Sequence, residues 1–280
     1  QFRTNDQMIS NALKRGIYSN LAVLSNIFEH DDFDKSEKIK KIVSEELSSY
    51  DLKQYLSNRN FIIYLAAANP KAFLDFIIND IHKGGVLLDA LFKGRKKELS
   101  LTGWEINYTE LIHALECIAL DKRFLYEVTY ILLYAMRFPK VDNYVDSVRE
   151  LLGRIYQLGH AQTNATFNER FNVIIQLNTT YPKEVFWILC HMIDSITEPH
   201  SFFISQGFPT QIYRHKKEND TIYVGDLNNI LSFIPEVYSS TEDDYLKCIN
   251  IAMRRKLINL TSPLIDFLTK EATNFKKNVR

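Results

Sequence analysis

The chain has 280 residues, enough for one elongated unit or two ordinary domains, and its 34 Lys plus Arg equal its 34 Asp plus Glu. It therefore lacks the basic excess of a whole-chain nucleic-acid binder, and its 46% hydrophobic content argues against disorder. No apolar stretch reaches the length of a membrane span, and only nine glycines and seven prolines favour helices over sheets.

Helical patterns dominate the chain from its start. A first helix is predicted from about Asp6 to Phe28, and Ser36 is a good N-cap for a second, amphipathic helix that ends near Leu47. Apolar residues then recur at helical spacing, with few breaks, from residue 106 to residue 194. We expect helices through most of the first 194 residues.

The most informative sequence feature is an internal repeat of three segments, each with an apolar helix, a break, a Lys and a second apolar helix. The break residues are Pro70, Asp121 and Pro182, which lie 51 and then 61 residues apart. Pro or Asp at this position suits the first turn of the following helix. Positions +3, +4, +7 and +11 from each break are apolar, as one stripe of an α-helix requires. These positions are Phe73, Leu74, Ile77, Ile81, Phe124, Leu125, Val128, Leu132, Val185, Phe186, Leu189 and Ile193.

The repeat predicts an all-α fold, an irregular array of helical hairpins of the tetratricopeptide (TPR) or HEAT kind. A hairpin that cannot bury its own apolar stripe must stack on its neighbours. The alternative is a compact helical bundle in which the three similar segments are a coincidence.

The segment from 197 to 240 differs in composition from the rest. It contains Pro199, Pro209 and Pro235, and the run from Thr221 to Gly225 is β-prone. We interpret it as a long loop, with a small β-hairpin near 208–225 as a further option. Two final helices are predicted near 242–256 and 262–276.

The expected organisation is one continuous module, with N-terminal helical hairpins over 1–100, central repeats over 101–196, the loop-rich insertion over 197–240 and C-terminal helices over 241–280. The start at Gln1 without a Met indicates a fragment of a larger chain.

No complete catalytic motif is present: a phosphate-binding loop, His-Glu-x-x-His, Cys-x-x-Cys and Gly-x-Ser-x-Gly are all missing. We therefore expect no catalytic, metal-binding or cofactor-binding residue here. His30 next to Asp31 is better explained as a solvated helix end than as half of a metal-dependent phosphohydrolase site, and His191 as a core or interface imidazole. The basic run 93–97 is interpreted as a solvated loop, with a phosphate or nucleic-acid contact as the alternative.

The three cysteines are scattered, and each falls within an apolar run. Cys117, Cys190 and Cys248 do not resemble a disulfide framework. We interpret them as reduced core residues, suited to a reducing cytosol. The expected location is therefore cytoplasmic.

Several segments between residues 102 and 214 together resemble a known family. The segments are Thr102-Gly103-Trp104, Leu111-Ile112-His113-Ala114-Leu115-Glu116, Ser147-Val148-Arg149-Glu150-Leu151-Leu152, His160-Ala161-Gln162-Thr163-Asn164-Ala165-Thr166-Phe167-Asn168-Glu169-Arg170, Tyr181-Pro182-Lys183-Glu184-Val185-Phe186-Trp187 and Pro209-Thr210-Gln211-Ile212-Tyr213-Arg214. They are similar to the C-terminal tetratricopeptide-like sensor region of bacterial antiviral STAND NTPases of the Avs type. This chain departs from that pattern at Ala161, where the family has Pro, and at 212–215, where the family has a Pro-Arg-Trp-Arg-like ending.

The resemblance implies a pattern-recognition module. In that family the helical array binds a conserved phage protein, such as a terminase large subunit or a portal. Binding then lets a separate NTPase domain oligomerise and activate an effector. The resemblance thus implies that ATP and Mg²⁺ bind to the NTPase domain and that oligomerisation proceeds through the parent protein. It also implies that the other domains of the parent protein are further partners of this chain. Neither a membrane nor a nucleic acid is an expected partner.

Candidate partner-binding residues are the aromatic and Arg side chains of the long loop, because such residues are enriched at interface hot spots. They are Phe202, Phe203, Phe208, Tyr213 and Arg214. The alternative is that some of these aromatics tuck under the loop. Upstream, Thr163 or Asn164 is expected to cap the helix that follows, with Glu169 supporting its first turn.

Two hypotheses from different classes remain. The first is a phage-protein sensor built from helical hairpins. The second is a structural scaffold within a large multidomain NTPase, with no foreign ligand. An enzyme, either a metal phosphohydrolase or a nuclease, is a distant third, and it requires an acidic or histidine cluster near His30 or His191.

Overall fold

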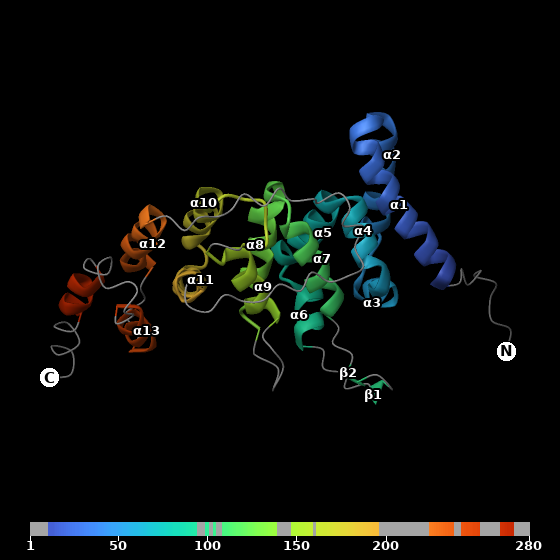
Figure 1. The fold of residues 1–280 in the computed structure, drawn as a ribbon. Helices are drawn as coiled ribbons and strands as arrows, with labels where there is room; N and C mark the ends of the chain where they lie inside the picture. Colours follow the sequence, from blue (N-terminus) through green and yellow to red (C-terminus); the bar gives the residue numbers. More distant parts are fainter. Residues whose placement is uncertain are drawn as a thin grey trace. The chain divides into compact units, whose positions relative to one another are not determined.

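The computed structural model describes residues 11–93, 99–100, 103–104, 108–138, 147–158, 161–195, 224–237, 242–252 and 264–271. Over these residues the fold is an array of α-helices (Figure 1), which confirms the predicted all-α class. Two compact units are present. Among the described residues, the first unit extends to Ala119 and takes in 137–138, and the second holds 120–136 and everything from 147 onward. The units separate between Ala119 and Leu120.

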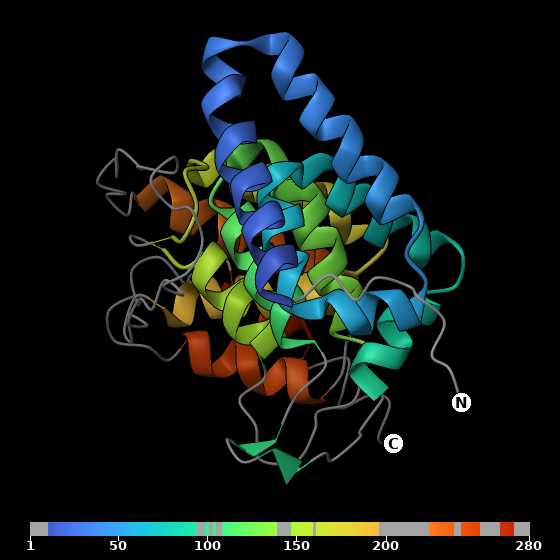
Figure 2. The ribbon, with the colours of Figure 1, turned by 90° about the vertical axis from the view of Figure 1, so that its right-hand side faces the viewer.

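Where the structure describes the first unit, it is helical apart from a short β-hairpin. Its elements are α1 (Asn11–Asp31), α2 (Phe33–Ser48), α3 (Leu52–Asn58), η1 (Arg59–Phe61), α4 (Ile62–Ala68), α5 (Pro70–His82), α6 (Val86–Lys93), β1 (Leu99–Ser100), β2 (Gly103–Trp104) and α7 (Thr109–Ala119). Helices α1 and α2 form the blue hairpin whose turn lies at the top of Figure 2. Strands β1 and β2 are antiparallel, with Leu99 opposite Trp104. Most of the hairpin expected near 208–225 lies outside the described residues.

The start of α2 differs from the prediction. Asp32 is the N-cap, and its side chain accepts a hydrogen bond from the Lys35 backbone N–H at 3.2 Å. Ser36, the predicted cap, lies one turn inside the helix and is buried. The prediction was wrong because Asp32 offers the same capping chemistry one turn earlier and also forms an ion pair with Lys35.

The second unit contains η2 (Lys122–Phe124), α8 (Leu125–Ala135), α9 (Ser147–Tyr156), α10 (Phe167–Asn178), α11 (Pro182–Asp194), α12 (Val224–Val237) and α13 (Glu242–Ala252), and residues 264–271 are also helical. Helix α12 corrects the expectation of a loop over 197–240. Its residues Leu227, Ile230, Leu231 and Ile234 are buried at helical spacing. Pro235 lies inside this helix, near its C-terminal end.

All three breaks of the sequence repeat begin a helical segment. Pro70 and Pro182 are the first residues of α5 and α11, and Asp121 is the N-cap of η2, which leads into α8. Of the twelve stripe positions after the breaks, all except Phe124 are buried. The predicted stripe is therefore the core-facing side of α5, α8 and α11.

The three cysteines are free thiols in the interior, as predicted. Burial raises the pKa of the Cys117 and Cys248 thiols to about 12 and raises that of Cys190 further. At neutral pH these side chains are therefore protonated, unreactive core residues.

Across the described helices, none combines the length and the apolar content needed to span a membrane.

Candidate functional site

The five expected partner-binding residues, Phe202, Phe203, Phe208, Tyr213 and Arg214, lie outside the described residues. The part of the candidate site that the structure describes is therefore the segment between α9 and α10, residues 161–166, here named the connector. It carries the Gln-Thr-Asn-Ala-Thr run of the family resemblance.

The connector ends in a capping box at the start of α10. Thr166 is the N-cap: its hydroxyl accepts a hydrogen bond from the Glu169 backbone N–H at 3.3 Å, and the Glu169 carboxylate accepts one from the Thr166 backbone N–H at 2.8 Å. Glu169 thus supports the first turn, but the expected cap at Thr163 or Asn164 is corrected to Thr166. The Thr163 hydroxyl instead accepts a hydrogen bond from the Ala165 N–H at 3.3 Å, which bends the chain before the helix begins.

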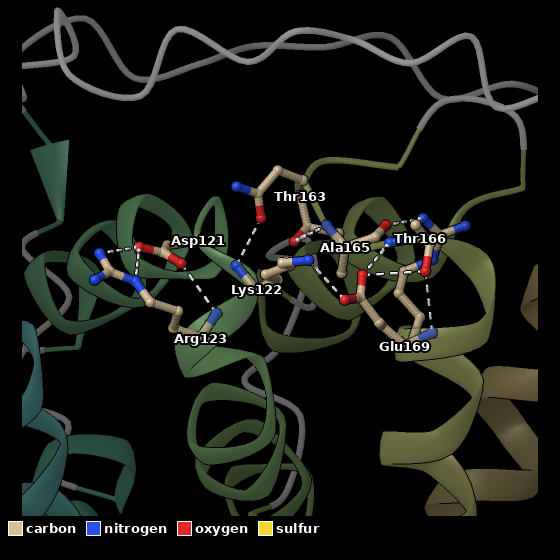
Figure 3. Close-up of polar contacts among 9 residues, drawn as sticks. Asp121, Lys122, Arg123, Thr163, Ala165, Thr166 and Glu169 are labelled. Carbon is tan, nitrogen blue, oxygen red and sulfur yellow. Dashed lines mark hydrogen bonds and ion pairs between the residues drawn. The ribbon is translucent and has the colours of Figure 1, made fainter.

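Asn164 caps a different repeat from the one expected. Its side-chain oxygen accepts a hydrogen bond from the Lys122 backbone N–H at 2.7 Å, and its own N–H donates to the Leu120 carbonyl at 3.0 Å. The Lys122 ammonium also reaches Glu169, at 2.7 Å (Figure 3). The connector therefore ties the start of α10 to the start of η2, where a helical N–H would otherwise lack an acceptor.

The ion pair between Lys122 and Glu169 is solvent-accessible. The two side chains are 50% and 41% exposed. The hydrogen bond from Lys122, helped by the two from Thr166, lowers the pKa of the Glu169 carboxyl against a smaller opposing effect of burial. Water screens the attraction, so the pair contributes about 0.2–1 kcal/mol, as exposed pairs usually do.

The inner side of the connector is fixed by two arginines. The Arg154 side chain in α9 donates to the Gln162 side-chain oxygen at 2.9 Å, and the Gln162 N–H donates to the Arg154 carbonyl at 2.9 Å. Arg170, only 1% exposed, donates to the Ala165 carbonyl at 2.9 Å. The polar side chains of the connector, Gln162, Thr163, Asn164 and Thr166, thus have partners within the chain, and their first role is to hold the backbone.

A stack of aromatic and cationic side chains joins α9 to α11. The rings of Trp187 and His191 lie parallel, with centroids 5.1 Å apart, and the Arg149 guanidinium lies 5.6 Å from the Trp187 ring centre. Gly153 of α9 faces His191 so closely that a Cβ atom there would lie 2.5 Å from Nε2. A glycine is therefore required for α9 and α11 to approach this closely.

Trp187 and His191 occupy positions +5 and +9 of their repeat, and the same positions of α8 hold Tyr126 and Tyr130. Tyr126 is 42% exposed, and the other three are partly exposed. Both helices thus carry an aromatic pair outside the buried stripe, here named the aromatic pairs. The sequence analysis missed them because it followed only the apolar stripe, although the equal offset from the break was already visible.

In the described part of the chain, no group of three or more His, Cys, Asp or Glu side chains could hold a metal ion. His191, one of the two histidines considered for an enzyme, stacks on Trp187. The side chains of His30 and Asp31 lie outside the described residues.

No protein family, curated protein or solved structure matches this chain.

Proposed function

We propose that this chain is the protein-binding sensor module of a cytoplasmic antiviral STAND NTPase, which recognises a phage terminase large subunit or portal and thereby licenses oligomerisation of its parent protein. The proposal combines the sequence resemblance over 102–214 with a surface suited to protein binding. ATP and Mg²⁺ would act in the NTPase domain of the parent.

The observation that carries the proposal is the presence of the aromatic pairs at matching positions of successive repeats. Aromatic residues contribute large contact areas at interfaces, and helical arrays use equivalent positions of consecutive repeats to bind an extended partner. Tyr126 on α8 is the most exposed of the four side chains. It is therefore the position at which a bound partner would bury the most aromatic surface.

A structural scaffold inside a large multidomain NTPase is the second candidate. The connector favours it, because Gln162, Asn164, Thr166 and Glu169 all bond within the chain. In that case the resemblance would reflect a shared way of joining repeats and no shared ligand.

The test is a pull-down of this chain against a panel of phage terminases and portals. We expect specific capture of one member of the panel, lost in Tyr126→Ala and in the double variant Tyr213→Ala/Arg214→Ala. Phe33→Ala is the matched control, since Phe33 is a large aromatic residue, 72% exposed, on α2. It should capture as the unmodified chain does.

The outcomes separate the two candidates. Capture by the full-length parent but never by this chain would favour the scaffold. Capture by neither would contradict phage-protein sensing. Equal loss in Tyr126→Ala and Phe33→Ala would show that the aromatic pairs are not the binding face.

A further inference from the structure

We draw no further inference here: the strongest candidate, the exposed apolar face of helix α1 between Leu13 and Ile27, carries none, because nothing in the structure shows what covers it.

Discussion

At the scale of single residues, the polar side chains of the connector form hydrogen bonds within the chain that hold its helices in place. The Asn164 side chain accepts a hydrogen bond from the backbone at the start of η2, and the Thr166 side chain accepts one from the first turn of α10. Glu169 bonds to both Thr166 and Lys122. Apart from the ion pair between Lys122 and Glu169, these contacts satisfy backbone N–H groups at the start of a helix, which lack partners in the helix itself. A resemblance that depends on such residues therefore indicates, first, a shared way of joining the repeats.

The charge of Glu169 can be tested separately from its capping role. In Glu169→Gln the amide oxygen can still complete the capping box, so only the ion pair with Lys122 is lost. We expect the free energy of unfolding at pH 7 to fall by about 0.2–1 kcal/mol, measured by urea titration.

The pH dependence of this difference has a defined sign. The folded pKa of Glu169 is depressed, so its stabilisation is present above the unfolded pKa of about 4.3 and is lost as pH falls through the folded pKa. The difference in the free energy of unfolding between wild type and Glu169→Gln should therefore disappear in acid. In the Lys122→Met background the substitution should have little effect at any pH; a full effect there would disprove the pairing.

At the scale of elements, the packing of α9 on α11 depends on the absence of one side chain. Gly153 lets the His191 ring approach the α9 backbone, while Trp187 and Arg149 continue the stack. The contact fixes the spacing of two helices that belong to successive parts of the repeat.

Gly153→Ala should destabilise the chain although alanine is the better helix former. The new methyl group would overlap the His191 ring and force it or a helix to move, at a cost of about 1–3 kcal/mol in thermal or urea unfolding. Gly16→Ala is the matched control: its Cβ would meet nothing within 4 Å, so it should stabilise by about 0.5–1 kcal/mol. Partial recovery is expected in Gly153→Ala/His191→Ala, and equal effects of the two glycine substitutions would rule out this packing.

At the scale of the whole molecule, the two compact units each possess their own core. Phe73 in α5 and Leu189 in α11 are both completely buried, one in each unit. In arrays built from neighbouring contacts, stability is a sum of local terms, and local opening follows the same units.

Hydrogen exchange followed by mass spectrometry can show this division. Phe73→Ala, which should cost about 3–5 kcal/mol, is expected to speed exchange in α1, α2, α4 and α5, and Leu189→Ala in α9, α10 and α11. Each substitution should leave the helices of the other unit nearly unchanged. A uniform increase over both units would instead show a single cooperative core.

The sequence was most informative where one local rule decided the structure. Pro70 and Pro182 begin helices, where the missing N–H costs no hydrogen bond, and the Asp121 carboxylate caps η2. The N-cap of α10 was harder to predict, because Thr163, Asn164 and Thr166 have similar capping chemistry. Which of them is the N-cap depends on the path of the backbone. Helix α12 was missed because the prolines and the β-prone run of residues 197–240 were given more weight than the apolar residues at helical spacing from Leu227 to Ile234.

The candidate site was less predictable than the fold. The aromatic pairs lie off the stripe that identifies a helix, and stacking of Trp187 on His191 depends on Gly153 in another helix. Local spacing cannot report such a contact.

The bonds of the connector to the preceding repeat also carry an evolutionary consequence. Asn164 and Glu169 bind Lys122, which belongs to the preceding repeat. A single repeat that is copied or exchanged on its own would therefore lose one partner of each of these bonds. Duplication or recombination of this chain would succeed only in blocks that carry residues 120–123 together with 161–170. Among relatives that share the joint, a change at position 122 should be matched by one at position 169.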